Sequence, residues 1–434
     1  VNNYYFLRRL VPLLQSHLVG RTIAEVYAQN KHEYVFQLDH PVKGEALVFY
    51  FGNRASFAFM DNKAKPRSGA LPCFRATNGA YVTDVQEIAN DRSFVLALSS
   101  NYYLLFKLYG VHGNVILFES DEPQEAIRKR LQQDQKAKLH TYHQAIDQSL
   151  DAYRYASDNG SAPWEGIQQL FPTFTKDFRK WLVNYGFDRQ HDTEKQWELI
   201  QQLLTTINTN PLCLQYEDNE YLDDTGYRLS FFETSSTIES FIDSLTAVNT
   251  FASYFLRKAQ IQYYKQILLS HWQKALKQHK KRVKSVNSNL QKLVEGYDYQ
   301  QLADIIMANL HVLKKGMTEA ELYDFYHNQM VTVTLKQSLS PQANAERLYK
   351  KAKNQSIELA TAEQNLEQEQ ERLALAQAEY QQIVEEDDFK KLKQQYQQHL
   401  QKQKPQKPAD RIRDKFKHFR VKGYDIYVGK GAAV

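Results

Sequence analysis

The residues best suited to chemistry in this sequence stand together as Asn90-Asp91-Arg92, just ahead of the strand-like run Ser93–Leu98. The planar guanidinium of Arg matches a phosphate or a guanine edge, and an adjacent carboxylate can orient it or accept a hydrogen bond from a base amino group. An Asp-Arg pair before a strand is more commonly a turn with a surface ion pair. The surroundings of Asp91 and Arg92 must decide between these two interpretations.

A second chemical feature is a long cationic stretch. Residues Phe251–Lys292 contain ten Lys or Arg residues and no Asp or Glu. Apolar residues recur in this stretch at helical spacing, which predicts one long helix with an apolar seam and a cationic outer face. The expected seam residues are Leu256, Ala259, Tyr263, Ile267, Trp272, Leu276, Val283, Val286, Leu290 and Leu293. Such a face favours a polyanion or an acidic partner helix.

A candidate partner helix spans Ala345–Asp388, which contains eleven acidic and five basic residues. Its heptad pattern has two seam positions, occupied by Leu359, Leu366, Leu373 and Tyr380 and by Ala362, Ala376 and Ile383. The two stretches predict an antiparallel coiled-coil hairpin with arms of roughly 65 Å. The acidic arm could simply neutralise the basic arm. However, the cluster Lys277, Lys280, Lys281, Arg282 and Lys284 covers more than one helix face, so we expect part of its charge to be exposed.

The elements that must position these residues follow from the apolar pattern. Asn2–Val19 fits an amphipathic helix that ends at Gly20. Short apolar runs then predict a mainly antiparallel β domain over residues 1–121. The expected strands are Thr22–Ala28, Tyr34–Leu38, Ala46–Phe51, Ala55–Met60, Tyr81–Gln86, Ser93–Leu98, Tyr102–Tyr109 and Asn114–Glu119.

The remaining sequence predicts further domains, so the expected fold class is multidomain α+β. Residues 122–160 are polar and predict a helical or loose linker. Residues 161–236 predict a small helical domain, in which two short helices around Pro172 form either a helix-hairpin-helix element or a pair that merely packs. Coiled-coil arms over 237–294 and 344–400 flank a small middle domain, 295–343, at the tip.

The middle domain and the end of the chain have their own patterns. We expect a helix over Tyr299–Leu313 and a strand over Met330–Leu335. The Gln- and Lys-rich composition of Glu385–Asp410 predicts a linker. Residues 401–434 are therefore expected to hold linker and the beginning of a β domain. Because that domain is incomplete, we expect the chain to be a fragment of a longer protein.

Composition and motifs argue against several function classes. The net charge is only +5, so the basic character is local. Cys73 and Cys213 are far apart and fit neither a disulfide framework nor a metal-type spacing. The sequence has no GxSxG, phosphate-loop or HExxH motif, and no apolar run of the ~18 residues that would span a membrane. The Leu-rich start lacks a signal-peptide layout. We expect a cytoplasmic binding protein with no cofactor, not an enzyme.

Three runs show a resemblance to a known family. They are NDRSFVLALSSNYYLLFKLYGVHGNVILFES (90–120), LADIIMANLHVLKKG (302–316) and LKQSLSPQANAERLYKKAKN (335–354). Together they resemble the NFACT family, which includes the RqcH proteins of bacteria and NEMF of eukaryotes; an older name for bacterial members is fibronectin-binding proteins. The terminal HFRVKGYDIYVGKGAAV resembles the opening of the family's NFACT-R domain. The resemblance covers nearly the whole chain in matching order.

The resemblance implies an NFACT-N domain, a helix-hairpin-helix domain, a coiled-coil hairpin with a middle domain at its tip, and the start of NFACT-R. The implied function is ribosome-associated quality control. The partners would be rRNA of a large ribosomal subunit obstructed by a peptidyl-tRNA nascent chain, and a recruited tRNA for template-free C-terminal tailing, with alanine in bacteria. Peptide bond formation would belong to the ribosome. The alternatives are a surface adhesin for a fibronectin-like matrix protein, disfavoured by the missing secretion signal, and a structural coiled-coil scaffold.

The resemblance also implies site residues. The family's Asp-Arg pair, needed for tRNA recruitment, falls on Asp91 and Arg92. Asn3 stands where many members carry an Asp, and Arg75 lies where Phe74-Arg75-Ala76-Thr77 replaces an Arg-Lys-His run. With rRNA as the implied partner, we expect the cations of the long helix and of the tip to contact it: Lys274, Lys277, Lys280, Lys281, Arg282, Lys284, Lys314 and Lys315. NFACT-N also resembles formamidopyrimidine-DNA glycosylases, but their N-terminal Pro-Glu pair is Val1-Asn2 here, so we expect no lyase chemistry.

Overall fold

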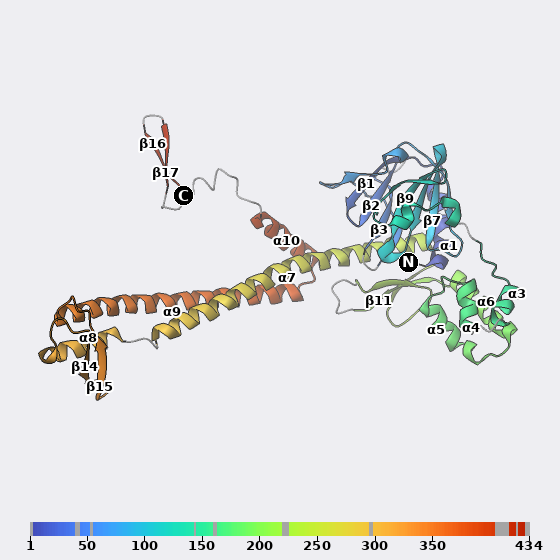
Figure 1. Cartoon of the computed structure of the whole chain (residues 1–434). Coiled ribbons are helices and arrows are strands. Elements are labelled where there is room, and N and C mark those ends of the chain that lie inside the picture. Colours follow the sequence, from blue (N-terminus) through green and yellow to red (C-terminus); the bar gives the residue numbers. More distant parts are fainter. Residues whose placement is uncertain are drawn as a thin grey trace. The chain divides into compact units, whose positions relative to one another are not determined.

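The computed structural model describes residues 3–39, 44–52, 55–142, 145–158, 163–218, 225–294, 298–403, 416–421 and 424–429. Predictions that fall on Val1, Asn2 and residues 404–415 lie outside these ranges. The chain divides into two compact units, residues 1–262 and 263–434, and the predicted multidomain α+β class is confirmed (Figure 1). Among the described helices, none combines the length and the apolar character that a membrane span requires.

The first helix is α1 (Tyr4–Leu18), close to the predicted bounds. Asn3 caps it, because its side-chain oxygen accepts a hydrogen bond from the Tyr5 amide at 2.8 Å. Leu7, Leu10, Leu14 and Leu18 recur at helical spacing and are buried. The chain leaves the helix through Gly20, whose φ of 82° suits glycine.

Two five-stranded antiparallel sheets follow α1. The first has the order β4-β3-β2-β1-β5 and contains β1 (Ile23–Asn30), β2 (Glu33–Leu38), β3 (Ala46–Phe51), β4 (Ser56–Asp61) and β5 (Leu71–Pro72). The second has the order β10-β9-β8-β7-β6 and contains β6 (Val82–Glu87), β7 (Ser93–Leu98), β8 (Tyr102–Lys107), β9 (Asn114–Glu119) and β10 (Glu122–Ala126). The eight predicted strands are all present, whereas β5 and β10 were not predicted.

The second sheet is buried on both faces. One face contacts the first sheet, where the Phe106 ring lies 5.2 Å from that of Phe36 and stacks on Phe94 at 4.7 Å, centroid to centroid. The opposite face includes Ile116 and Phe118 and is covered by Leu139. Burial on both faces explains why these strands are nearly continuous apolar runs.

The covering layer comes from the segment that was predicted to be a helical or loose linker, and the first residues of this segment form a strand instead. β10 pairs with β9, and α2 (Gln132–Gln135) and η4 (Leu139–Tyr142) follow it. β10 is an edge strand of sequence EPQEA, which has no apolar periodicity. The pattern that identifies a buried strand is therefore absent from this one.

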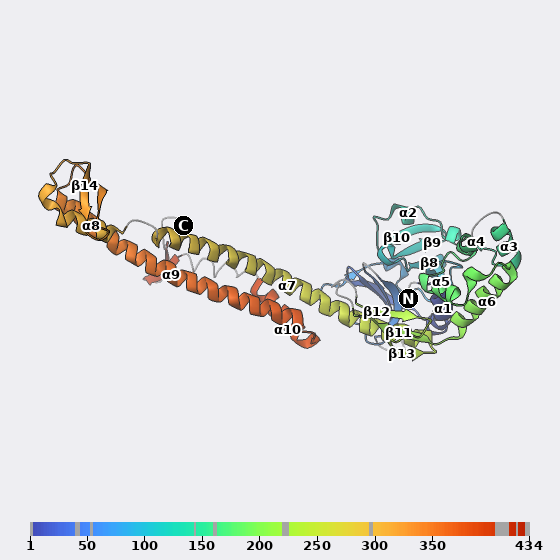
Figure 2. The same ribbon diagram turned by 90° about the horizontal axis from the view of Figure 1, so that it is seen from below.

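A cluster of helices completes much of the first unit (Figure 2). It consists of α3 (Leu150–Asp158), α4 (Pro163–Leu170), α5 (Lys176–Asn184), η5 (Phe187–Arg189) and α6 (Thr193–Thr209). The two helices predicted around Pro172 are α4 and α5. A three-stranded sheet of order β12-β11-β13 comes next, with β11 (Leu212–Tyr216), β12 (Tyr227–Ser230) and β13 (Thr237–Phe241). Arg9 of α1 contacts the segment between α6 and β11, because its guanidinium donates a hydrogen bond to the Asn210 carbonyl at 2.7 Å.

The long helix α7 (Ser244–Val294) begins seven residues before the predicted start at Phe251. Its first turns belong to the core of the first unit. The ring of Phe57 on β4 lies 5.1 Å from that of Phe251 and 5.2 Å from that of Phe255. The Met60 amide also donates to Asn249 Oδ1 at 2.9 Å. Phe251 is therefore a residue of the β-domain core.

In the second unit, α7 and α9 (Pro341–Glu385) lie side by side (Figures 1 and 2). The seven predicted seam residues of α9 are all buried or half-buried. On α7 the prediction of Tyr263 is wrong: its side chain is 50% exposed, whereas Tyr264 is 6% exposed. Lys265 shares this buried side, and its Nζ donates to the Val384 carbonyl and to Asp387 Oδ1, both at 2.9 Å.

Another polar pair lies in the middle of the seam. Glu369 takes the heptad position between Ala362 and Ala376, and its Oε2 lies 2.8 Å from His279 Nδ1. The hydrogen bond with His279, followed by that from Arg372, lowers the pKa of Glu369, although desolvation opposes the shift. A buried polar pair at a single heptad layer favours one register over its neighbours, because any slip leaves both groups unpaired.

The seam pair predicts a pH-dependent effect of Glu369→Gln. The pKa of Glu369 in the folded protein lies below the ordinary value of 4.5. The charged carboxylate therefore stabilises the fold fully above pH 4.5, and this stabilisation is lost as the pH falls through the folded pKa. We expect Glu369→Gln to melt at a lower temperature than the wild type at about pH 7 and at the same temperature near about pH 3. Circular dichroism melts would measure this, with the exposed Glu371→Gln as the control. A difference that persists at the lowest pH would contradict the assignment.

Helix α10 (Phe389–Gln403) lies mostly within the predicted arm 344–400, and it corrects the linker predicted from composition for residues 389–403. Its residue Leu392 is fully buried, and the ring of Tyr396 stacks on Tyr264 of α7 at 4.8 Å. Phe389, Leu392, Tyr396 and His399 recur at intervals of three and four, a helical signal within the Gln- and Lys-rich composition.

The middle domain has its own small core, which includes Ile305, Ile306, Leu322 and Val333. Its elements are α8 (Tyr299–Ala308), η6 (Leu310–Val312) and the hairpin of β14 (Glu319–Asp324) and β15 (Gln329–Thr334). The predicted helix thus ends early, and β14 was not predicted. A separate hairpin of β16 (Phe416–Val421) and β17 (Tyr424–Gly429) ends the described chain.

Candidate nucleic-acid interface

The loop that holds Asp91 and Arg92 connects β6 to β7. Asn90 opens the turn with a φ of 56°, a left-handed conformation that Asn tolerates. Gln148 holds the loop, because its Nε2 donates to Asn90 Oδ1 at 2.8 Å and to the Leu170 carbonyl at 2.5 Å. The loop is therefore fixed by a side chain from outside the sheet.

Tyr109 lies across the hairpin from Asp91. The β7–β8 register pairs Ser93 with Lys107, and one step further the Leu108 amide donates to the Arg92 carbonyl at 2.8 Å. Next to this bond the Tyr109 hydroxyl donates to Asp91 Oδ2 at 2.5 Å. Burial, followed by the hydrogen bond to Asp91, raises the pKa of Tyr109. The hydroxyl is therefore protonated at neutral pH and acts as the donor.

The Tyr109 ring also contacts Arg92, whose Cζ lies 5.0 Å from the ring centroid. A cation–π contact positions the guanidinium while leaving its N–H groups available. Within the described residues, Arg92 has no ion pair with Asp91, and the buried Asp91 Oδ1 has no hydrogen-bond partner. The structure therefore does not support a turn closed by an ion pair. It presents an exposed five-donor fork beside an acceptor.

A pocket of about 480 Å³ lies beside this loop. Tyr109, which contacts both Asp91 and Arg92, is one of the residues that line it. Its lining residues are Lys107, Tyr109, His112, Arg130, Leu131, Gln132, Gln133 and Asp134. Lys107 Nζ donates to Asp134 Oδ1, and Asn114 Nδ2 donates to Asp134 Oδ2 at 2.7 Å. These three side chains are buried, so Lys107 and Asp134 form a fixed floor, which Asn114 supports from behind the lining.

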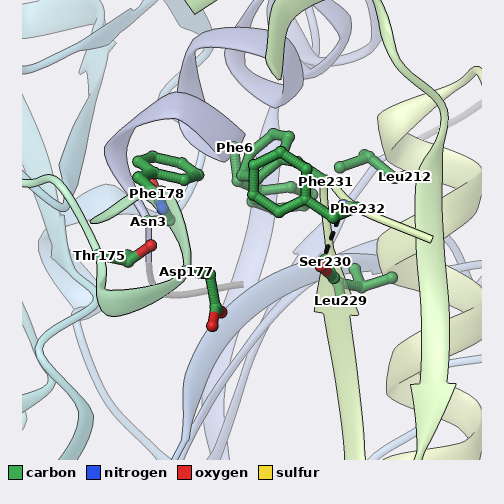
Figure 3. Close-up of a pocket in the computed structure, with 10 residues that line it drawn as sticks. All are labelled: Asn3, Phe6, Thr175, Asp177, Phe178, Leu212, Leu229, Ser230, Phe231 and Phe232. Carbon is green, nitrogen blue, oxygen red and sulfur yellow. Dashed lines mark hydrogen bonds between the residues drawn. The ribbon is translucent and has the colours of Figure 1, made fainter. Parts of the chain in front are cut away.

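Asn3 lies at a different pocket, of about 160 Å³, which Figure 3 shows. Phe6, Phe178, Phe231 and Phe232 contribute to its walls, together with Thr175 and Asp177 at the start of α5. The Phe232 amide donates to Ser230 Oγ at 3.1 Å and closes one side. Asn3 itself is engaged as the cap of α1, and its assignment to tRNA stays a prediction.

Arg75 is exposed in the short helix η1 (Arg75–Thr77). Phe74 precedes it with a φ of 48° and is buried against Phe36 at a centroid distance of 6.0 Å. The buried ring anchors the loop, so that the neighbouring Arg75 faces solvent. Among the described residues, no hydrogen bond or ion pair joins Arg75, Asn3 and Asp91 to one another.

All eight cations predicted to contact rRNA are exposed. They comprise six residues of α7, namely Lys274, Lys277, Lys280, Lys281, Arg282 and Lys284, and the pair Lys314 and Lys315 after η6. Within the described part of the chain, the only one of the eight with an ion pair is Arg282, whose Nη1 lies 3.6 Å from Glu369 Oε1. The predicted solvent exposure of this charge is confirmed, and neutralisation by the acidic helix does not account for it.

Four of the α7 lysines form a single row, which we call the cationic stripe: Lys274, Lys277, Lys281 and Lys284. At about 100° per residue they fall within an arc of about 80° centred opposite His279, which faces α9. Like charges this close together repel one another, and together they create a positive electrostatic potential along the helix. A row of this kind suits a polyanion whose charges repeat along a line.

The described residues offer little for other chemistry. They contain no group of three His, Cys, Asp or Glu side chains that could hold a metal ion. Both cysteines are free, and burial raises the pKa of the Cys73 thiol to about 12, which makes it a poor nucleophile.

Comparison with known proteins identifies the family. Residues 3–417 match the NFACT N-terminal and middle domains. Two curated proteins named Rqc2 homolog RqcH, from Streptococcus pneumoniae serotype 2 strain D39 and from Streptococcus pneumoniae strain R6, are each 18% identical over 364 residues. The match covers 80% of this chain and spans 65% of the length of these relatives.

Several solved structures are similar to part of this chain. The fibrinogen-binding protein from Staphylococcus aureus is 12% identical, with a TM-score of 0.43, over 58% of this chain and 98% of that chain. The N-terminal part of the fibronectin/fibrinogen-binding protein from Streptococcus suis is 16% identical, with a TM-score of 0.42, over 58% and 99%. These likenesses are too weak for an argument. The family match itself covers almost the entire chain, and the protein therefore belongs to the NFACT family.

Proposed function

We propose that this protein is a ribosome-associated quality-control factor that acts in the cytoplasm. It binds the obstructed large ribosomal subunit through rRNA and recruits tRNA for template-free tailing of the stalled nascent chain. The proposal rests on the match over residues 3–417, which includes both the Asp91-Arg92 loop and the cationic stripe. The name Rqc2 homolog RqcH of the pneumococcal relatives supports it.

The two surfaces suit two different tasks. The cationic stripe supplies ammonium groups whose N–H donors rotate freely and have no fixed geometry, which gives affinity for phosphates and no sequence discrimination. The Asp91-Arg92 loop supplies an oriented fork and an acceptor, which can select a particular nucleotide arrangement. We assign the stripe to rRNA and the loop to tRNA. Peptide bond formation is left to the ribosome, so the protein acts as a binding factor and not as an enzyme.

The test is recovery of the protein from cell lysate followed by sequencing of the bound RNA, for the wild type and for Asp91→Ala/Arg92→Ala. The wild type is expected to recover large-subunit rRNA and one enriched tRNA. The double variant is expected to keep the rRNA and to lose about tenfold or more of the tRNA, because charge-assisted hydrogen bonds are removed.

The matched control is Arg420→Ala/Asp425→Ala, which removes an exposed pair of the same charges from the terminal hairpin. It should recover both RNAs at wild-type levels. Absence of both RNAs from the wild-type sample would overturn the proposed function. Equal tRNA recovery by the two double variants would overturn the role of Asp91 and Arg92 and would favour a structural scaffold.

A further inference from the structure

We propose that the pocket beside the Asp91-Arg92 loop, hereafter the nucleotide pocket, holds one unpaired nucleotide of the RNA that this loop binds. The inference rests on the proposed function and adds a subsite to it. The pocket shares Tyr109 with the loop: the Tyr109 hydroxyl binds Asp91, its ring contacts Arg92, and it also lines the pocket. A strand bound at Arg92 would therefore meet the nucleotide pocket with its adjacent nucleotide.

The charge of the nucleotide pocket favours an anionic ligand. Among the described residues that line it, the only carboxylate is that of Asp134, which is 2% exposed, and both of its oxygens accept hydrogen bonds, from Lys107 and from Asn114. Arg130 at the rim is exposed and has no hydrogen bond or ion pair among the described residues. The rim therefore carries an uncompensated positive charge, and the floor supplies no repulsion for a phosphate.

The remaining walls fit a base. The side-chain amides of Gln132 and Gln133 offer both donors and acceptors, and the adjoining Leu131 and Tyr109 offer apolar surface. Proteins recognise unpaired RNA bases by such a combination of edge hydrogen bonds and flat apolar contacts. A volume of about 480 Å³ lies in the range of pockets that enclose a small organic ligand.

The Figure 3 pocket is a poor alternative for the same ligand. It is about three times smaller, at about 160 Å³, and four of the ten residues that line it are phenylalanine. The exposed carboxylate of Asp177 lies at its edge, with no basic partner among the described residues. A phosphate would be repelled there.

The nucleotide pocket can be tested with Arg130→Ala and the matched control Lys129→Ala. Lys129 is the neighbouring exposed cation and does not line the pocket. The probe is a fluorescein-labelled transcript of the tRNA that co-purifies with the wild type, carrying 4-thiouridine for photocrosslinking. We expect about tenfold weaker binding for Arg130→Ala, less than about twofold for Lys129→Ala, and a wild-type crosslink within residues 130–133 or at Tyr109.

The outcomes separate this inference from the proposed function. If Arg92→Ala weakens binding while Arg130→Ala matches Lys129→Ala, the pocket is wrong and the tRNA loop stands. If the two variants at 129 and 130 weaken binding equally, general charge explains the effect and the pocket is again wrong. If the transcript does not bind the wild type, both proposals fail. A crosslink outside the pocket also overturns the inference.

Discussion

Replacement of Lys274, Lys277, Lys281 and Lys284 by Gln is expected to lower the affinity for the large ribosomal subunit by about 10²- to 10³-fold at about 0.1 M salt. The physical reason is counterion release, since each lysine that neutralises a phosphate contributes roughly 0.7 to 0.9 to the slope of log affinity against log salt concentration. Four lost contacts should reduce that slope by roughly 3. Sedimentation with purified subunits over a series of salt concentrations measures both quantities.

The matched control replaces four exposed lysines of α9 and α10 by Gln, namely Lys350, Lys353, Lys390 and Lys393. It changes the net charge by the same amount but leaves the cationic stripe intact. We expect less than about a threefold loss for this control, because charges remote from the contact are screened beyond about one Debye length. Equal losses for the two quadruple variants would show that only the total charge matters and would remove the stripe from the rRNA interface.

The sequence was sufficient to predict that the cationic stripe and the apolar seam lie on different sides of α7. It was not sufficient to predict the polar pairs that lie within the seam. Leucine and alanine at heptad spacing identify the buried side of α9 correctly. Glu369 breaks that pattern, and its partner His279 was not expected in the seam. Apolar periodicity cannot show that a buried acid has found a basic partner on another helix, since pairing depends on the axial alignment of the two helices.

Only part of the Asp91-Arg92 site could be predicted from the sequence, for a similar reason. The pair itself could be found from its types and position, whereas Tyr109 lies eighteen residues later in the chain. A signal for Tyr109 did exist: a hairpin that pairs Ser93 with Lys107 also brings residue 91 opposite residue 109. The nucleotide pocket was missed because its floor depends on Asp134, within a polar segment whose composition indicated a linker.

The ion pair of Lys107 and Asp134 in the floor of the nucleotide pocket gives the largest expected effect on stability. Lys107 is 8% exposed and Asp134 is 2% exposed, and Asn114 is fully buried beside them. Asp134→Ala leaves the Lys107 ammonium buried without its counter-charge, which typically costs about 3–5 kcal/mol. We expect the free energy of unfolding of the first unit to fall by that amount. Denaturant titration followed by tryptophan fluorescence measures it, because Trp164, Trp181 and Trp197 all lie in this unit.

A double variant tests whether the lost stability comes from the unpaired charge or from the lost packing. Lys107→Met/Asp134→Leu removes both charges while keeping most of the side-chain volume, and such replacements are often neutral or stabilising. We therefore expect this double variant to unfold at a higher denaturant concentration than Asp134→Ala. If the two unfold together, the ion pair is not what holds α2 on the end of the second sheet, and the packing of Leu139 against that sheet becomes the main attachment.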